Sequence, residues 1–306
     1  MVEMTEWSRA DARAVLRRPT ATDDKYSRGV LGVRTGSQRY PGAAVLGVEA
    51  AWRTGLGMVR YLGDERPTSL ILQRRPETVS ADGRVQAWLI GSGTDAADRS
   101  DVETQTLRDI LAGAVPVVVD AGALDLAVGA AAPRILTPHD REHARLREGL
   151  GLDALPEGAD ERARAASALQ TARALEAVVL LKGASTIVAT PGGRVRLVHT
   201  GTPWLATAGT GDVLGGTIGA VLAGAHLDEE RGGDLEQLGA VAATGAWLHG
   251  CAARRAALTA ADRSPGDVAF ARNVTGGGDE VFGGPITALD VADALASVVA
   301  WTLAAD

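Results

Sequence analysis

The sequence contains a single cysteine, Cys251. One cysteine excludes an intramolecular disulfide and is typical of a protein from a reducing compartment. The segment from Met1 to Pro19 is charged throughout and lacks the apolar core of a signal peptide. No apolar run reaches the length that a bilayer span requires. A cytoplasmic protein is therefore the expectation.

The sequence also lacks an excess of positive charge: 31 lysines and arginines face 38 aspartates and glutamates, and the formal net charge at pH 7 is −7. This balance argues against nucleic acid or an anionic membrane as the main partner. It leaves small anionic ligands open, since local backbone amides can bind them. The chain has 306 residues, 46% of them hydrophobic, and neither an internal repeat nor a long linker divides it. We expect one domain over residues 1–306, with residues 1–24 as an N-terminal extension.

Two common nucleotide-binding motifs are missing. No Gly-x-Gly-x-x-Gly follows a first strand, which argues against a dinucleotide dehydrogenase. No Gly-Lys-Ser/Thr follows the glycines of the most informative stretch, Thr200–Gly224, so this stretch is not a Walker loop. It begins as a polar loop rich in glycine and proline, and it ends as an apolar segment that predicts a helix.

The junction of that loop and helix holds Gly209, Thr210, Gly211 and Asp212. Glycines allow a tight turn and the close approach of a ligand to the backbone. The predicted helix directs its free N–H groups and the positive end of its dipole at this turn. The sequence therefore predicts an anion site here, most plausibly for a phosphate.

Asp212 has two interpretations. A carboxylate in the first helical turn can cap the helix. Beside a phosphate site it can instead accept a proton from a substrate hydroxyl. Gly215, Gly216 and Gly219 lower helix stability unless something packs very close to them, and we take this as favouring the catalytic interpretation.

The rest of the chain alternates between predicted strands and predicted helices. Strands are expected at residues 29–33, 58–62, 70–72, 86–90, 115–119, 134–136 and 178–181, followed by a hairpin of 187–189 and 195–199. Helices are expected at 41–55, 101–112, 161–176, 235–258 and 287–303, a short helix near the start, and a surface loop at 259–285. This alternation predicts an α/β fold with a mainly parallel sheet covered on both faces.

Ligands of such sheets bind beyond the carboxyl ends of the strands. Unusual residues follow several of the predicted strands, namely Gly91–Gly93, Asp120, His139 and Lys182. We expect them to gather at one edge of the sheet together with Asp212.

Several segments, in the same order and with the same spacing over residues 25–225, resemble one family. They include KYSRGVLGVRTGS (25–37), ILTPHDREHARL (135–146), LKGAST (181–186) and Thr200–Gly224. They resemble the ADP-dependent NAD(P)H-hydrate dehydratases of the ribokinase-like superfamily. The resemblance implies a ribokinase-like three-layer sandwich and a lyase that restores NADH and NADPH from their hydrates, NADHX and NADPHX, with ADP as co-substrate and Mg²⁺.

The resemblance also implies residue roles. Asp212 would act on the hydroxyl of the hydrate, and Gly209, Thr210 and Gly211 would form the anion hole. The adenine nucleotide would contact Gly211 and the run Lys182, Gly183, Ala184, Ser185 and Thr186. The hydrate would contact Ala43, Gly93, His139 and Asp212. No protein ligands to a metal are implied. A homo-oligomer is expected, and the short N-terminal extension leaves no room for the epimerase domain of many relatives, so we expect a separate epimerase.

Three positions depart from the family pattern. Trp204 stands where the family usually has glycine, Gly122 stands where it commonly has aspartate, and Asp140-Arg141 replaces Pro-Gly. These departures bear on the contacts to substrate and nucleotide.

Three alternatives remain. His139-Asp-Arg-Glu142-His143 matches the inverted zinc-protease pattern, but Thr137-Pro138 places His139 at the entrance of a helix, and we interpret His143 as a solvated helix residue. An ATP-dependent kinase of a vitamin precursor alcohol would also use Asp212 as base, although residues 25–57 argue against it. A non-catalytic nucleotide sensor would tolerate replacement of Asp212.

Overall fold

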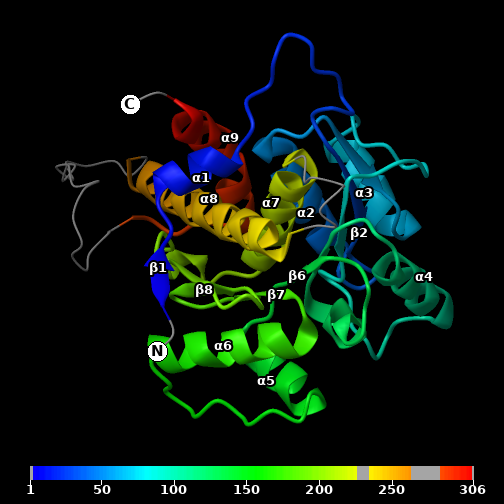
Figure 1. Cartoon of the computed structure of the whole chain (residues 1–306). Helices are drawn as coiled ribbons and strands as arrows, with labels where there is room; N and C mark the ends of the chain where they lie inside the picture. The colour runs from blue at the N-terminus through cyan, green and yellow to red at the C-terminus, as the bar shows by residue number, and fades with distance from the viewer. Residues whose placement is uncertain (1–2, 226–233, 263–282, 305–306) are drawn as a thin grey trace.

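The computed structural model describes residues 3–225, 234–262 and 283–304. Within them a nine-stranded sheet has the strand order β1-β9-β8-β7-β6-β5-β4-β2-β3 (Figure 1). The strands are β1 (Met4–Glu6), β2 (Val30–Arg34), β3 (Met58–Tyr61), β4 (Ala87–Ile90), β5 (Val117–Val119), β6 (Arg134–Leu136), β7 (Val178–Leu181), β8 (Thr186–Ala189) and β9 (Val195–Val198).

Only β8 runs antiparallel to its neighbours in the described sheet, pairing with β7 on one side and β9 on the other. The predictions of a mainly parallel sheet and of the hairpin are therefore confirmed. The helices are α1 (Arg9–Val15), α2 (Pro41–Thr54), α3 (Glu65–Arg74), α4 (Asp101–Ala112), α5 (Asp140–Gly149), α6 (Glu161–Leu175), α7 (Thr210–Gly224), α8 (Leu235–Asp262) and α9 (Ala288–Leu303), with short 3₁₀ turns η1 (Ala121–Ala127) and η2 (Pro203–Leu205).

Successive residues of the central strands point to opposite faces of the sheet, as the period of a strand requires. In β8, Val188 packs in the cluster that contains α7 and α8, whereas Ile187 and Ala189 pack with α6. In β5, Val118 likewise belongs to the first cluster, and its neighbours Val117 and Val119 face the other side. Because both faces are covered, these strands are continuous apolar runs, and the expected three layers are present.

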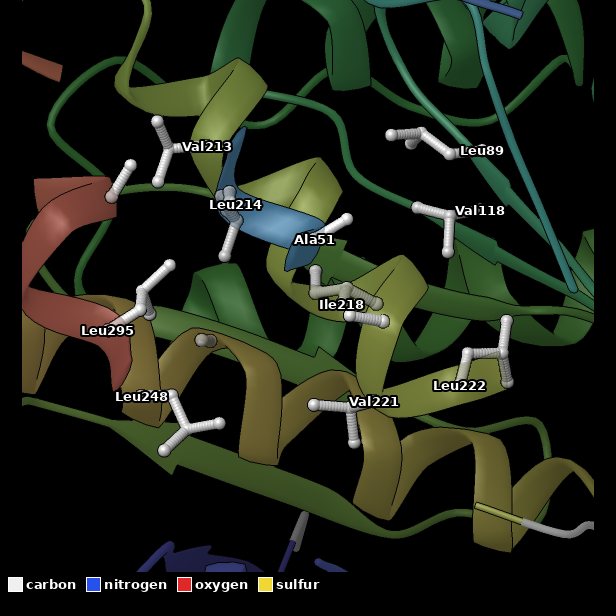
Figure 2. Packing of buried hydrophobic residues seen from close by; sticks show 14 of the residues in the cluster. Ala51, Leu89, Val118, Val213, Leu214, Ile218, Val221, Leu222, Leu248 and Leu295 are labelled. Carbon is white, nitrogen blue, oxygen red and sulfur yellow. The ribbon is translucent and has the colours of Figure 1, made fainter. Parts of the chain in front are cut away.

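Helix α7 lies inside the larger cluster (Figure 2). Ile218 is fully buried, with Leu89 of β4 and Leu248 of α8 in the same cluster. Burying a side chain of this kind stabilises the fold by about 1.5–3 kcal/mol. The helix is apolar all round because neighbours surround it.

The glycines of α7 are explained by this packing. A Cβ on Gly216 would lie 2.1 Å from the carbonyl oxygen of Gly47 in α2, and one on Gly219 would lie 3.0 Å from Leu31 of β2. A Cβ on Gly215 would lie 3.2 Å from Leu89. The close neighbours are protein atoms, so our use of these glycines as an indication of catalysis was wrong.

Two predicted elements differ from the structure. Residues 70–72 lie in helix α3, not in a strand, because only Pro67 and Ile71 of that helix are buried, one turn apart. A short apolar run of this kind does not distinguish helix from strand. In the N-terminal extension, β1 precedes the expected helix, and Met4 pairs with Val195 at the end of the sheet.

Helix α8 continues to Asp262, four residues beyond the predicted end at Leu258. Most of the predicted surface loop at 259–285 lies outside the described residues. In the described ranges, no helix combines the length and the apolar character needed to cross a bilayer.

Candidate active site

The carboxyl ends of four adjacent strands meet at Asp120, which follows β5. This residue is 4% exposed, and its side chain accepts hydrogen bonds on both oxygens. Ser92 Oγ, after β4, donates at 3.0 Å, and Thr137 Oγ1, after β6, donates at 2.8 Å. The ammonium of Lys182, after β7, lies 2.9 Å from Asp120 Oδ1. The expected gathering of strand ends at one edge is thus present.

Lys182 links Asp120 to the glycine turn. Its side chain is 21% exposed, and its ammonium lies 3.8 Å from Glu142 Oε2 of α5. A Cβ on Gly211 would lie 3.9 Å from the same ammonium. Burial lowers the pKa of Lys182, but the Asp120 and Glu142 carboxylates together outweigh this effect, so the net shift is upward. The lysine is a permanent cation beside the first turn of α7.

The first turn of α7 has the geometry of an anion site. Gly209 precedes it with φ 90°, a left-handed conformation that favours glycine. The hydroxyl of Thr210 donates to the carbonyls of Leu205 and Thr207, which fixes the loop. The N–H groups of this first turn have no intrahelical acceptor. The turn can therefore bind a phosphate by its backbone, and the Lys182 ammonium adds a positive charge.

Asp212 is half-buried in this turn. Burial and then the Asp120 carboxylate raise its pKa, the Lys182 ammonium counteracts part of the shift, and the net value is about 7. A carboxyl group that titrates near neutral pH can accept a proton from a hydroxyl and release it again. The sequence marked this residue, but its proton affinity depends on Asp120, which is 92 positions away in the chain.

The loop after β7 is fixed by Arg164 of α6, a residue that the sequence did not mark. Its guanidinium donates to the carbonyls of Lys182 at 3.0 Å and Ser185 at 3.1 Å. A Cβ on Gly183 would lie 2.5 Å from the same group. The run from Lys182 to Thr186 is thus a fixed loop, and Gly183 and Ala184 are exposed.

The three residues expected at the hydrate lie around this edge. A Cβ on Gly93 would lie 2.3 Å from that of Ala43, so the two are in contact. His139 caps helix α5: its Nδ1 accepts from the backbone of Arg141 at 3.1 Å, and its backbone donates to Glu142 at 2.8 Å. Its ring is 47% exposed. Glu142 thereby connects His139 with Lys182.

The zinc-protease pattern does not form a metal site. His143 is 2% exposed, and its Nε2 lies 2.9 Å from Thr171 Oγ1 of α6. Burial lowers the pKa of His143 to about 4, so the ring is neutral. Our interpretation of His143 as a solvated residue was therefore wrong. Across the described parts of the chain, no cluster of three or more His, Cys, Asp or Glu side chains could hold a metal ion.

A cleft of about 410 Å³ opens beside this edge. It begins at Thr94, next to Gly93, and its far wall includes Glu142 and Arg145 of α5. Leu124 and Leu146 give it an apolar part. The cleft is large enough to accept a ring system next to the polar groups around Lys182.

The departures from the family pattern have local structural partners. A Cβ on Gly122 would lie 2.4 Å from the carbonyl oxygen of Thr94, so the loop after β4 leaves no space for a side chain there. Asp140 accepts from Arg164 at 2.9 Å. Trp204 lies in η2 and is exposed on the loop before the anion turn.

Arg254 of α8 is another residue that the sequence did not mark. Its guanidinium donates to the carbonyls of His199 at 2.8 Å and Gly201 at 3.2 Å. It fixes the start of the loop that leads to Gly209. Neither Arg164 nor Arg254 belongs to a motif, and each acts on backbone far away in sequence.

Comparisons with known proteins identify the family of the chain. A profile of the NAD(P)H-hydrate dehydratase family matches residues 31–267. The chain is 41% identical over 271 residues to the bifunctional NAD(P)H-hydrate repair enzyme Nnr of Mycobacterium leprae, a match that covers 85% of this chain and 52% of that protein. It is 34% identical over 249 residues to the ADP-dependent (S)-NAD(P)H-hydrate dehydratase of Neisseria meningitidis, covering 75% of this chain and 77% of that one.

A crystal structure gives the same result for the fold. The ADP/ATP-dependent NAD(P)H-hydrate dehydratase from Bacillus subtilis, co-crystallised with ATP and Mg²⁺, superposes with a TM-score of 0.75 at 26% sequence identity. The superposition covers 97% of this chain and 98% of that chain, which confirms the ribokinase-like fold. The chain spans about half the length of the Mycobacterium leprae protein. From the extent of the profile match and the identity to these relatives, the chain belongs to the NAD(P)H-hydrate dehydratase family.

Proposed function

We propose that this chain dehydrates NADHX and NADPHX to NADH and NADPH in a reaction driven by ADP. One observation carries the proposal: Asp212, with a pKa of about 7, lies in the first turn of α7 beside the glycine turn and the Lys182 ammonium. This arrangement pairs a base with an anion site, which phosphoryl transfer to a hydroxyl requires. The names of the Neisseria meningitidis and Bacillus subtilis relatives support ADP as the co-substrate.

The proposed reaction has two steps. The Asp212 carboxylate accepts the hydroxyl proton of the hydrate while the hydroxyl oxygen attacks the terminal phosphorus of ADP, and AMP leaves. The phosphate group then departs with the electron pair of the carbon–oxygen bond, and the neighbouring ring carbon loses a proton to restore the double bond. Phosphate is a far better leaving group than hydroxide, and this difference is what the nucleotide supplies.

The site residues have proposed positions in this scheme. Gly209, Thr210 and Gly211 bind the transferred phosphate, and Lys182 to Thr186 contact the adenine nucleotide. Ala43, Gly93 and His139 contact the hydrate, and the neighbouring cleft provides space for the rest of that dinucleotide. Mg²⁺, which prefers phosphate oxygens, would neutralise charge on the bound nucleotide. We also propose that the enzyme is cytoplasmic and homo-oligomeric, and that it is functionally linked to an NAD(P)H-hydrate epimerase.

The test follows NADH absorbance at 340 nm, a wavelength set by the cofactor's own chromophore. Purified protein is mixed with NADHX and Mg²⁺ together with ADP, ATP or no nucleotide, and Asp212→Asn is assayed in parallel. We expect absorbance to return with ADP, and the variant to lose roughly a hundredfold or more in rate, as expected for loss of a positioned base. Circular dichroism of the variant verifies that it is folded.

Other outcomes separate the alternatives. No recovery with any nucleotide would refute the dehydratase proposal. Transfer of phosphate from ATP to an alcohol without dehydration would identify a kinase. Nucleotide binding with no turnover, unchanged in Asp212→Asn, would identify a sensor.

A further inference from the structure

Asp120 accepts hydrogen bonds from Ser92, Thr137 and Lys182, yet the proposed reaction does not involve it directly. We propose that Asp120 is a positioning residue of this site, which holds the Lys182 ammonium on its own carboxylate and thereby leaves Asp212 free to accept a proton. The catalytic part of this inference rests on the proposed function. The arrangement of charges does not depend on the proposed function, and it can be measured without turnover.

The position of the Asp120 side chain is fixed by three separate strand ends. Ser92 occupies one oxygen, and Thr137 and Lys182 share the other. Both hydroxyls are donors with ordinary distances of 3.0 and 2.8 Å, so the carboxylate is satisfied while ionised. The third partner of this buried carboxylate is the partly exposed ammonium of Lys182, which lies beside the glycine turn.

The backbone at Asp120 supports the same conclusion. Its N–H donates to Ile90 at 3.0 Å, which fixes it to β4. The next residue, Ala121, has φ 43° and is one of two non-glycine residues with positive φ among those described. A left-handed alanine costs about 1–2 kcal/mol, and such conformations collect at functional sites. The turn that carries Asp120 toward Lys182 therefore lowers the stability of the fold.

The charges at the site do not balance. The carboxylates are Asp120, Glu142 and Asp212, and the cation they share is Lys182. The groups that β4 and β6 add are the neutral hydroxyls of Ser92 and Thr137, and α2 approaches with the backbone of Gly47. From α8, His249 approaches the backbone of Thr210, and burial lowers its pKa to about 4, so it is neutral at pH 7.

Because three carboxylates share one lysine, the carboxylate that pairs with Lys182 determines how readily the other two bind a proton. In the structure Lys182 is bonded to Asp120 and lies farther from Glu142, at 2.9 and 3.8 Å. Asp212 therefore lacks a full counter-charge and retains a high proton affinity. If Asp120 were neutral, the ammonium would be released toward Asp212 and would weaken it as a base.

The experiment measures the titration of the Asp212 carboxyl directly. Proteins labelled with ¹³C at the aspartate carboxyl carbon are titrated by NMR, and the Asp212 signal is the one missing from Asp212→Asn. We compare the parent protein with Asp120→Asn and Lys182→Met. Asp109→Asn on the exposed surface of α4 is the matched control, because it removes a carboxylate that does not face the site.

The two site variants should move the Asp212 titration in opposite directions. In Asp120→Asn the midpoint should fall by about one pH unit or more, since a like charge is removed and an opposite charge is released. In Lys182→Met it should rise, because the two carboxylates then face each other without a cation. The control should leave it unchanged. A merely structural role for Asp120 would lower thermal stability without producing this opposition of signs.

The same variants distinguish this inference from the proposed function. If the parent protein dehydrates NADHX, the acid limb of its kcat/KM profile should shift downward in Asp120→Asn along with the NMR midpoint. An inactive parent protein would refute the function and leave the NMR result valid. An Asp212 midpoint that is unchanged or higher in Asp120→Asn would refute the positioning role. Should Asp120→Asn not fold, an unchanged midpoint in Lys182→Met would also refute it.

Discussion

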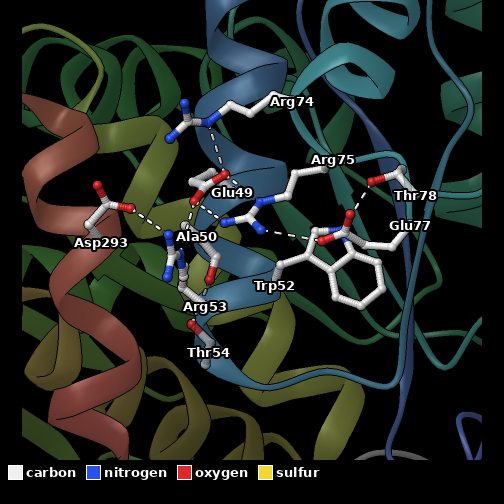
Figure 3. A network of polar contacts seen from close by, with 10 residues as sticks. All are labelled: Glu49, Ala50, Trp52, Arg53, Thr54, Arg74, Arg75, Glu77, Thr78 and Asp293. Atoms are coloured by element: carbon white, nitrogen blue, oxygen red, sulfur yellow. Dashed lines mark hydrogen bonds and ion pairs between the residues drawn. The ribbon is translucent and has the colours of Figure 1, made fainter.

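Two carboxylates on packed helices, Glu49 of α2 and Asp212 of α7, have opposite acid–base behaviour. Glu49 is 0% exposed and receives the guanidinium groups of Arg53, Arg74 and Arg75 (Figure 3). Burial alone would raise the pKa of Glu49, but these hydrogen bonds and charges lower it to about 2. The Asp212 side chain is partly exposed, and burial together with the Asp120 carboxylate raises its pKa to about 7, because the Lys182 ammonium, which is bonded to Asp120, offsets only part of the shift.

The comparison shows that burial raises the pKa of both acids, and that the number of cations nearby decides whether this increase is reversed. At Glu49 the arginines outnumber the carboxylate, and Arg53 extends the network to Asp293 of α9 at 2.9 Å. At the strand ends, the carboxylates outnumber the lysine. The first arrangement stabilises a junction of three helices, and the second leaves a group that can exchange a proton at neutral pH.

The largest effect is expected on the reaction rate, when the proposed base is replaced in a protein that still folds. Asp212→Asn should lower the rate of hydrate dehydration by about a hundredfold or more, since its base is lost. At pH 8 the variant should also be more resistant to urea by about 1 kcal/mol or more, because it no longer has to keep a poorly compensated charge in the site. Urea unfolding at pH 8 measures the second effect. A variant that is both inactive and less stable would contradict the comparison.

Removal of the compensated carboxylate should have the reverse effect. Glu49→Gln should lower the free energy of unfolding by about 3 kcal/mol, since three guanidinium groups lose a buried partner. Its activity below the unfolding temperature should stay close to that of the parent protein. Glu77→Gln is the control, because Glu77 is exposed and contacts Arg75 at 3.3 Å, and it should change stability by about 0.5 kcal/mol or less. Equal losses in both variants would refute a special role for Glu49.

The helix α7 offers a matched pair of glycines. Gly216→Ala places a Cβ 2.1 Å from the Gly47 carbonyl and should lower stability by about 1–3 kcal/mol. Gly211→Ala meets only the Lys182 ammonium, at 3.9 Å, so its stability should be unchanged. Its affinity for ADP should fall about tenfold, equivalent to about 1.4 kcal/mol. Thermal unfolding and calorimetric titration with ADP measure the two effects, and a stability loss in Gly211→Ala would contradict the assignment of that turn to a ligand.

The smallest effect is on the pH dependence of stability. The folded pKa of Glu49 is below its unfolded value of 4.5, so its contribution is complete above pH 4.5 and is lost as the pH falls toward 2. The folded pKa of Asp212 is above its unfolded value of 3.8, so this group adds stability as the pH falls from about 7 toward 4. The free energy of unfolding is measured with urea between pH 8 and 3. Glu49→Gln should lose only the pH dependence due to Glu49, and Asp212→Asn only the one due to Asp212. A variant that retains its slope would show that another group is responsible.

The sequence by itself determined the layers, most strands and the edge of the sheet at which the candidate residues gather. Continuous β-branched runs such as Val117–Val119 specify buried parallel strands, and Gly209–Asp212 specifies a turn at a helix start, because both depend on neighbouring residues. Segments whose identity depends on distant partners were not determined. Residues 70–72 became part of α3, and Met4–Glu6 became an edge strand through pairing with β9.

Only the tertiary structure decided the properties of the site residues. His143 is buried against Thr171 instead of solvated, Gly216 accommodates α2 instead of a ligand, and Arg164 fixes the loop after β7 from another helix. The proton affinity of Asp212 likewise depends on the bond between Asp120 and Lys182, which are 62 positions apart. Electrostatic energies depend on distances in space and on burial, and the fold sets both.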